Sequence, residues 1–150
     1  MKFLICGVGS IGSRHLENIS RLGYEDIILL RTGKSNLPSI NKYSKYKTFY
    51  NIEDALSEKP DICVISNPTS MHIETAILAA KNNCHLFIEK PLSHSADGLE
   101  ELDSLIKEKS LVSLVTYQFR YHPHIKLLKK LIKNPNKYGY PIYASADWSE

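Results

Sequence analysis

The sequence has no apolar run that approaches the ~20 residues needed to span a membrane as a helix. The apolar stretch near the N-terminus, residues 3–6, meets Gly7 at once and is too short for the core of a signal peptide. We therefore expect neither a membrane span nor a secretory leader, no membrane partner, and a cytoplasmic location.

Cysteine and net charge are also scarce. Three cysteines without close pairing exclude a disulfide framework and fit a reducing compartment. The net charge of +3, from 19 basic and 16 acidic residues, does not indicate a nucleic-acid partner. His122 and His124 form the only tight histidine pair, and no third ligand lies nearby in the sequence, so no metal site is expected. The hydrophobic share of 43% over 150 residues, by contrast, is enough for a buried core.

Short β-branched runs alternate with longer amphipathic stretches along the chain. The runs predict strands at residues 2–6, 26–31, 46–49, 61–66, 85–89, 111–117 and 142–147. The amphipathic stretches predict helices at 10–22, 52–58, 69–83, 95–109 and 125–133, with Asn51 as the N-cap of the second and Thr69 or Ser70 as the N-cap of the third. This alternation predicts an α/β fold, a doubly wound parallel sheet of the Rossmann type with helices on both faces.

A glycine-rich loop follows the first predicted strand and opens the first predicted helix. Its residues are Gly7, Val8, Gly9, Ser10, Ile11 and Gly12, a G-x-G-x-x-G pattern in the context that dinucleotide binding requires. Gly7 permits the tight turn, Gly9 lets the backbone approach a pyrophosphate, and Gly12 allows close packing of helix on strand. A flavin or methyl-donor fold is the alternative for such a loop.

The end of the second predicted strand carries Arg31 and Thr32, where an acidic residue would hold the ribose hydroxyls of NAD. An arginine there pairs with a 2′-phosphate and stacks on adenine. No Asp or Glu lies between Asp26 and Glu53, so we expect a nicotinamide dinucleotide, NAD(P), with NADP favoured over NAD. A basic exposed loop that folds away from the adenosine is the alternative.

Four motifs in order resemble the N-terminal part of the glucose–fructose oxidoreductase, inositol 2-dehydrogenase and rhizopine-catabolism (Gfo/Idh/MocA) family. The first is the glycine loop, which many folds share. The other three are Asp61-Ile62-Cys63-Val64-Ile65-Ser66-Asn67-Pro68-Thr69 with His72, Glu89-Lys90-Pro91-Leu92, and Tyr117-Gln118-Phe119-Arg120-Tyr121-His122-Pro123. The Glu-Lys-Pro, with the Asn-Pro-Thr and His72, is much more specific than the loop, and together the four motifs cover nearly the whole chain.

The resemblance implies an NAD(P)-dependent oxidoreductase that transfers hydride between the nicotinamide and a hydroxyl or carbonyl of a sugar, polyol or sugar nucleotide. It implies that Lys90 lies over the nicotinamide as the catalytic residue, where an ammonium manages the proton of the reacting oxygen. A surface lysine before a proline is the alternative. Glu89 is expected to make a local backbone or ribose contact.

The resemblance also implies cofactor contacts at the carboxyl ends of the other strands. Ser66, Asn67 and Pro68 close the fourth strand at the switch point of the sheet, beside the crevice for the cofactor. His72 lines the nicotinamide ribose, or is a solvated helix histidine. The remaining pair, Gln118 and Arg120, bonds the carboxamide or substrate, or forms a hydrogen-bond network at a helix start.

Relatives of this kind carry a second domain that shapes the substrate site and helps the protein form a homo-oligomer. We expect a dinucleotide-binding domain at residues 1–123, and at 124–150 a connecting helix and the first strand of a truncated second α+β domain. Such a fragment would bind the cofactor and be inactive alone. A shortened relative, a non-catalytic sensor or regulatory module, and a methyltransferase are the competing interpretations, although Lys90 has no purpose in a sensor and residues 89–91 have none in a methyltransferase.

Overall fold

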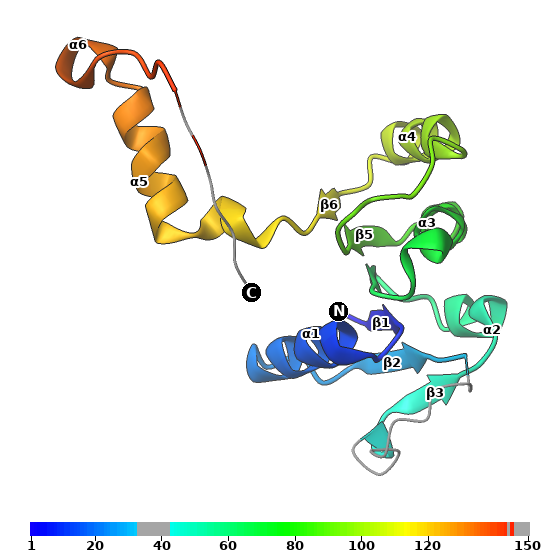
Figure 1. Ribbon diagram of the computed structural model, residues 1–150. Coiled ribbons are helices and arrows are strands. Elements are labelled where there is room, and N and C mark those ends of the chain that lie inside the picture. Colours follow the sequence, from blue (N-terminus) through cyan, green and yellow to red (C-terminus); the bar gives the residue numbers. More distant parts are fainter. Residues whose placement is uncertain (33–42, 144, 146–150) are drawn as a thin grey trace. The chain divides into compact units, whose positions relative to one another are not determined.

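The computed structural model describes residues 1–32, 43–143 and 145, which fall into two units, Met1–Thr116 and Tyr117–Glu150 (Figure 1). The predicted domain boundary after residue 123 concerns the whole protein and stays a prediction. The first unit is built on a six-stranded parallel sheet with the order β3-β2-β1-β4-β5-β6. This is the doubly wound α/β arrangement that the alternating pattern predicts, with its switch point between β1 and β4.

The strands are short and mostly apolar, as expected for strands covered on both faces. They are β1 (Phe3–Cys6), β2 (Ile27–Leu30), β3 (Lys47–Phe49), β4 (Ile62–Ile65), β5 (His85–Ile88) and β6 (Ser113–Val115). The helices of the first unit are α1 (Ser10–Arg21), α2 (Ile52–Ser57), η2 (Thr69–Met71), α3 (His72–Lys81) and α4 (Leu99–Glu108).

Alternate residues of β1 divide the core into two layers. Leu4 and Cys6 pack in a cluster with apolar residues of α2, α3 and α4. Phe3 and Ile5 pack in a second cluster with Leu16 of α1. Because successive strand residues point to opposite faces, helices cover both faces of the sheet, as the sequence predicts.

Buried thiols behave as the small apolar side chains that their sequence surroundings indicate. Cys6 and Cys63 are fully buried with their Sγ atoms 3.5 Å apart, and the contact with Cys6 and burial raise the pKa of Cys63. Burial likewise raises the pKa of Cys84 to about 12. All three cysteines are free, and the raised pKa values keep the thiols of Cys63 and Cys84 protonated at neutral pH.

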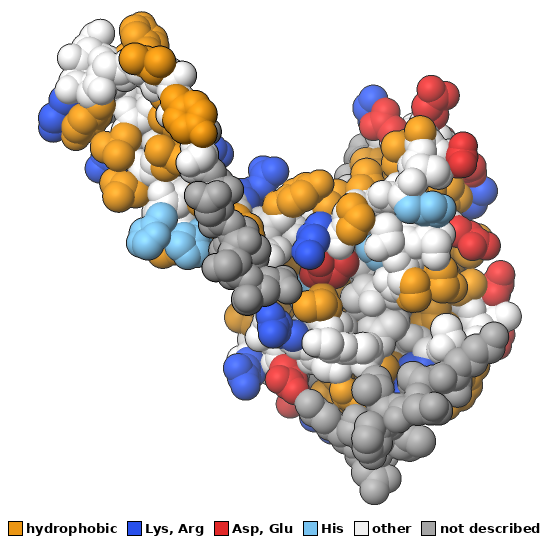
Figure 2. All heavy atoms as spheres, in the orientation of Figure 1, with side chains coloured by type: hydrophobic (Ala, Val, Ile, Leu, Met, Phe, Trp, Pro, Cys, Tyr) orange, Lys and Arg blue, Asp and Glu red, His pale blue; other side chains and the backbone are white. Residues whose placement is uncertain are grey.

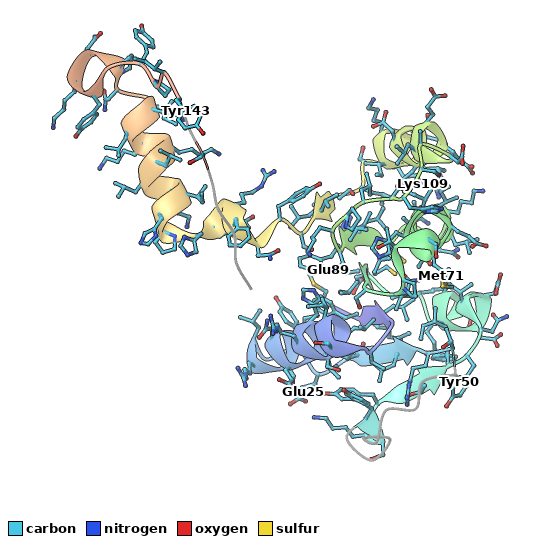
Figure 3. All side chains as sticks on the ribbon, in the orientation of Figure 1. Glu25, Tyr50, Met71, Glu89, Lys109 and Tyr143 are labelled. Atoms are coloured by element: carbon cyan, nitrogen blue, oxygen red, sulfur yellow. The ribbon has the colours of Figure 1, made fainter. Side chains whose placement is uncertain are left out.

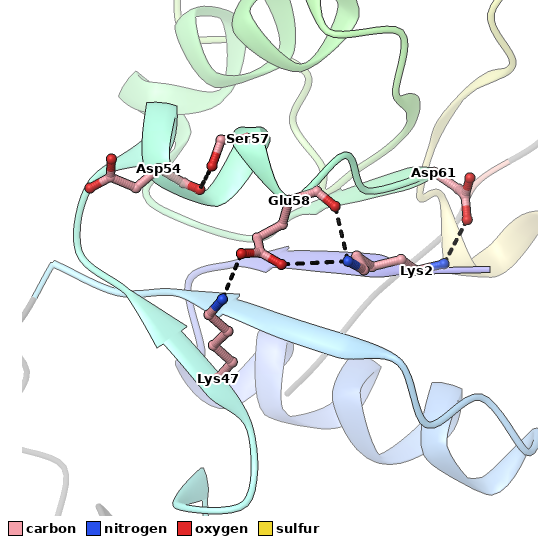
Figure 4. Close-up of polar contacts among 6 residues, drawn as sticks. All are labelled: Lys2, Lys47, Asp54, Ser57, Glu58 and Asp61. Atoms are coloured by element: carbon pink, nitrogen blue, oxygen red, sulfur yellow. Dashed lines mark hydrogen bonds and ion pairs between the residues drawn. The ribbon is translucent and has the colours of Figure 1, made fainter.

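Charged side chains join the amino end of β1 to neighbouring elements (Figure 4). Lys2 Nζ donates to the carbonyl of Glu58 at 2.9 Å, and Lys47 Nζ donates to Glu58 Oε1 at 2.5 Å. The hydrogen bond from Lys47, opposed by some desolvation, lowers the pKa of Glu58. Asp61 accepts from the Lys2 backbone N–H at 2.6 Å. These contacts lie at the end of the sheet opposite to the glycine loop.

Several predicted boundaries are wrong. The expected helix at 95–109 begins only at Leu99, because Gly98 takes a left-handed φ of 76° and Ser95 Oγ accepts from the Asp97 N–H, which forms a local turn. The expected helix at 69–83 is a 3₁₀ turn, η2, followed by α3. Neither Thr69 nor Ser70 caps α3, whose N-cap position is Met71 without a side-chain bond.

The second unit contains η3 (Gln118–Tyr121), α5 (Pro123–Ile132) and α6 (Pro135–Tyr138). Helix α5 ends at Ile132, and Pro135 starts the single turn of α6. Apolar side chains of α5 are exposed, with Leu127 at 54% and Leu128 at 49% (Figure 2). The described residues of the expected strand at 142–147, which are 142, 143 and 145, form no strand, and the rest lie outside the described residues.

Candidate functional site

The residues that follow five of the strands form one row at the carboxyl edge of the sheet. Each donates its backbone N–H to the last residue of the neighbouring strand, and this regular pairing brings together segments far apart in the sequence. The bonds are Arg31 N–H to Phe49 O, Gly7 N–H to Leu30 O, Ser66 N–H to Cys6 O, Glu89 N–H to Ile65 O and Thr116 N–H to Ile88 O, at 2.9–3.0 Å.

The three glycines of the loop meet different surroundings. Gly7 has a φ of +87°, in the left-handed region that favours glycine. A Cβ on Gly12 would lie 1.8 Å from Gly7 O and 2.7 Å from Ser66 Oγ, so a side chain at this position collides with the loop. A Cβ on Gly9 would meet no atom of the described residues within 4 Å. Gly7 and Gly12 are therefore needed for the loop itself, whereas Gly9 keeps the space in front of it open.

Two serine hydroxyls fix the loop. Ser66 Oγ donates to Gly7 O at 2.8 Å, and Ser13 Oγ lies 3.1 Å from Val8 O. Ser13 Oγ also lies 2.5 Å from the hydroxyl of the buried Tyr43. Ser66 was predicted as a site residue, and its bond to Gly7 O stabilises the glycine loop. Ser13 was not predicted, because a serine inside a helix carries no signal of its own.

Helix α1 begins at Ser10, within the glycine loop, and presents its N-terminus there. Its N-cap, Gly9, makes no side-chain capping bond, and its first turn contains no acidic residue. The first N–H groups of a helix have no partner within the helix, and the helix dipole adds a partial positive charge. This end of α1 is therefore suited to an anion such as a phosphate.

A cavity of about 610 Å³ lies over the loop at the carboxyl ends of β1, β2 and β4. Most of its wall consists of residues predicted for the cofactor site: Gly7, Val8, Gly9, Ser10, Ile11, Arg31, Thr32, Ser66, Asn67 and Pro68. The other wall residues were not predicted: Cys6, Leu30, Tyr50, Ile52 and Met71. Tyr50 and Met71 are labelled in Figure 3. Tyr50 and Ile52 follow β3, so the rule that sites form at strand carboxyl ends would have found them.

Arg31 enters the cavity wall from the end of β2. Its side chain is half-buried, and its guanidinium carbon lies 6.0 Å from the centre of the Tyr43 ring. Thr32 beside it is exposed. The basic residues of the following loop, Lys34 and Lys42, lie outside the described residues.

Lys90 lies at the carboxyl end of β5, exposed and outside the wall of the cavity. Glu89 before it is held by two contacts. His15 Nε2 lies 2.7 Å from Glu89 Oε1, and the Lys90 backbone N–H donates to Glu89 Oε2 at 3.1 Å. Burial acts to raise the pKa of Glu89, but hydrogen bonds, the one with His15 the largest among them, outweigh it and lower this pKa. The local backbone contact expected of Glu89 is present, whereas His15 was not predicted.

His72 occupies a different environment from either expectation. It is only 2% exposed, so the interpretation as a solvated helix histidine is wrong. Its Nδ1 lies 3.0 Å from Pro91 O and its Nε2 lies 2.9 Å from Asn67 O. Both ring nitrogens face backbone carbonyls, which leaves neither for the expected ribose contact. His72 instead joins the loop after β4 to the loop after β5.

Gln118 and Arg120 lie in η3 of the second unit, and their expected contacts with carboxamide or substrate stay predictions. In residues 1–32, 43–143 and 145, no group of three His, Cys, Asp or Glu side chains is arranged to hold a metal ion. Within the same part of the chain, no helix is long and apolar enough to cross a bilayer.

The residues present fit a dinucleotide. The open space at Gly9 leaves room for a pyrophosphate against the helix end, and a side chain there would fill it. The cavity extends from this point to Arg31 and Thr32 on one side and to Asn67 and Pro68 on the other. An elongated ligand with an anionic centre therefore matches both the cavity and the end of α1.

Comparisons with known proteins agree with this geometry. A family model described as "Oxidoreductase family, NAD-binding Rossmann fold" (GFO_IDH_MocA) matches residues 1–117. The oxidoreductase YrbE of Bacillus subtilis is 28% identical over 138 residues, which cover 87% of this chain and 39% of that protein. Myo-inositol 2-dehydrogenase of Thermotoga maritima is 26% identical over 139 residues, which cover 89% of this chain and 41% of the relative.

A solved structure shares the fold. The WlbA dehydrogenase of Bordetella pertussis, in complex with NADH and UDP-GlcNAcA, superposes with a TM-score of 0.79 at 23% identity. The match covers 89% of this chain and 42% of that one. The chain thus spans about 40% of the length of the relatives that it matches.

Proposed function

The chain belongs to the Gfo/Idh/MocA family of oxidoreductases, and on this premise we propose that it is the cofactor-binding part of an NAD(P)-dependent oxidoreductase acting on a sugar, polyol or sugar nucleotide. The observation that carries the proposal is the cavity whose wall joins the glycine loop to the carboxyl ends of β1, β2 and β4. In a doubly wound sheet this is the place where a dinucleotide binds.

Different residues of the cavity bind different parts of the dinucleotide. The N–H groups at the start of α1 hold the pyrophosphate, with Gly9 leaving room for it. Arg31 and Thr32 hold the adenosine end. The positive charge of Arg31 favours a ribose that carries a 2′-phosphate, so the cofactor preferred by this chain is NADP.

Lys90 manages the proton of the reacting oxygen. A bound nicotinamide supplies the carbon that accepts or releases hydride. When a substrate alcohol is oxidised, Lys90 Nζ as the free amine accepts the hydroxyl proton. In the reverse reaction the ammonium returns that proton to the carbonyl oxygen, and its charge stabilises the developing negative charge. The exposed position of Lys90 at the end of β5 supports this role because a substrate can reach it.

The similar proteins suggest two kinds of substrate, a free polyol and a sugar nucleotide. The relative from Thermotoga maritima is a myo-inositol 2-dehydrogenase, and the superposed structure from Bordetella pertussis contains UDP-GlcNAcA. Initial rates with myo-inositol and with UDP-GlcNAcA, each with NAD⁺ and NADP⁺, distinguish the two kinds in the full-length protein. Absence of turnover with sugars, polyols and sugar nucleotides alike would favour a sensor or regulatory module.

Replacement of Lys90 tests the mechanism. In the full-length protein, Lys90→Ala is expected to lower kcat about 10²- to 10⁴-fold, the usual loss for a positioned acid–base group. The dissociation constant of the dinucleotide, measured by calorimetry, is expected to change little because the pyrophosphate is held at α1.

Lys107→Ala is the matched control, since Lys107 is an exposed lysine on α4 that pairs only locally with Asp103 at 2.6 Å. This control is expected to keep the wild-type kcat. Wild-type turnover in Lys90→Ala would make Lys90 a structural residue and the proposed mechanism wrong.

A further inference from the structure

His15 of α1 is held firmly against the end of β5. Its Nε2 lies 2.7 Å from Glu89 Oε1, and the two side chains are only 17% and 16% exposed. The imidazole also packs edge-on against the Phe87 ring, with centroids 5.1 Å apart and an interplanar angle of 82°. Figure 3 shows Glu89 at the end of β5, next to α1. The contact therefore joins the helix behind the glycine loop to a strand that carries Lys90 at its end.

The carboxylate of Glu89, which contacts His15, also accepts a hydrogen bond from the backbone of Lys90. Glu89 Oε2 accepts the backbone N–H of Lys90 at 3.1 Å, while the N–H of Glu89 donates to Ile65 O at 2.9 Å. The lowered pKa of Glu89 means that it is ionised at neutral pH and accepts on both oxygens. His15 must then carry a proton on Nε2 to donate to it.

The residue on the other side of Lys90 is held by a second histidine. The carbonyl of Pro91 lies 3.0 Å from Nδ1 of the buried His72, whose Nε2 lies 2.9 Å from Asn67 O. Lys90 itself is exposed, yet both its neighbours contact histidines of other elements: Glu89 contacts His15 of α1, and the carbonyl of Pro91 contacts His72 of α3.

We propose that His15 and His72 are positioning residues for Lys90. They hold the backbone on both sides of it and thereby fix Lys90 relative to the helix end and to the loop that line the cofactor cavity. This inference rests on the proposed function, because it assumes that Lys90 acts on the substrate. In this arrangement, the contacts of His15 with Glu89 and of His72 with Pro91 hold Lys90 in a fixed position relative to the bound dinucleotide.

The first test separates positioning from folding in the full-length protein. His15→Phe keeps an aromatic ring against Phe87 and removes the N–H, and we expect kcat to fall about 10- to 100-fold, the cost of a misplacement of about 1 Å. The dissociation constant of the dinucleotide and the melting temperature are expected to stay close to wild type. His15→Gln, which retains a donor, is expected to recover most of kcat.

His94→Phe, a change at an exposed histidine in the turn before α4, is expected to leave kcat unchanged. A wild-type kcat in His15→Phe, or a loss that follows only the unfolded fraction, would overturn the proposal. Wild-type turnover in Lys90→Ala would instead refute the proposed role of Lys90, and with it the positioning of Lys90 by the two histidines.

A second test needs no substrate and no turnover. In the ¹⁵N-labelled 150-residue chain, the Lys90 amide resonance reports the ionisation of Glu89 through their hydrogen bond. His15→Phe removes a bond that lowers the pKa of Glu89, so the midpoint of this titration is expected to move to higher pH. An unchanged midpoint in His15→Phe would show that His15 does not act on the Glu89–Lys90 connection.

Discussion

Gly9 and Gly12 belong to one loop, but their replacement is expected to damage different properties. Gly9→Val places a side chain in open space, where no described atom lies within 4 Å of the Cβ position. The chain is therefore expected to fold normally and to lose dinucleotide affinity, because the new side chain occupies the room for the pyrophosphate. Calorimetric titration together with thermal unfolding measures both properties.

Gly12→Ala provides the contrast, since its Cβ would lie 1.8 Å from Gly7 O and 2.7 Å from Ser66 Oγ. Overpacking of this kind typically costs about 1–3 kcal/mol, so the melting temperature is expected to fall. An unaffected dinucleotide affinity in folded Gly9→Val would contradict the location of the phosphate site.

Arg31 is the residue on which the cofactor preference depends. A charged hydrogen bond contributes about 1.5–3 kcal/mol, so Arg31→Asp is expected to shift the ratio of NADP to NAD affinities about tenfold or more towards NAD. The acidic side chain repels a 2′-phosphate and accepts from ribose hydroxyls. The measurement is the ratio of the two dissociation constants in the wild type and the variant. Tighter binding of NAD than NADP by the wild type, or an unchanged ratio, would refute the assignment.

The helices depend on local signals that the sequence shows clearly in some places. Asn51 was predicted as the N-cap of α2, and its Oδ1 accepts the Asp54 N–H at 3.0 Å. Asn51→Ala is expected to lower the free energy of unfolding by about 1 kcal/mol, the usual value for a lost N-cap. Denaturant unfolding measures it. Asn18→Ala, at an exposed position within α1, is the control and is expected to cause no loss. Equal effects of the two changes would argue against the cap.

Element type was predictable wherever the hydrophobic period was strong, and element ends were less so. The six strands of the sheet and helices α1 and α2 match their predicted bounds within two residues at each end. The start of α4 was missed because the left-handed Gly98 and the Ser95 turn outweigh the helical pattern before Leu99. The turn η2 was missed because the sequence pattern does not distinguish a 3₁₀ turn from the first turn of an α-helix.

Some residues of the candidate site were predictable from the sequence, and others were not. Residues that follow strands were predictable, because parallel strands bring their carboxyl ends to one edge. The contact between His15 and Glu89 was not, since 74 residues separate them and α1 must first pack on the sheet. Likewise, the sequence shows His72 on an amphipathic helix, but only the packed structure places its two nitrogens between carbonyl groups.

At the scale of the whole molecule, this chain spans about 40% of the length of the relatives that it matches. Its second unit exposes apolar side chains on α5. We expect the 150-residue chain to bind a dinucleotide but to turn over no substrate, because we propose that the remaining length of the relatives completes the substrate site. Rates measured with the chain and with the full-length protein under identical conditions test this. Turnover by the chain alone, comparable to that of the full-length protein, would contradict it.

The binding of a dinucleotide over the glycine loop is tested most directly by titrating the ¹⁵N-labelled chain with NADP⁺ and recording its amide resonances. We expect saturable shifts that are largest for Gly9, Ser10, Ile11 and Gly12 at the start of α1, with further shifts at Arg31 and none along α4. Shifts that are absent, or that cluster away from the loop while the amides of residues 9–12 stay unchanged, would contradict it.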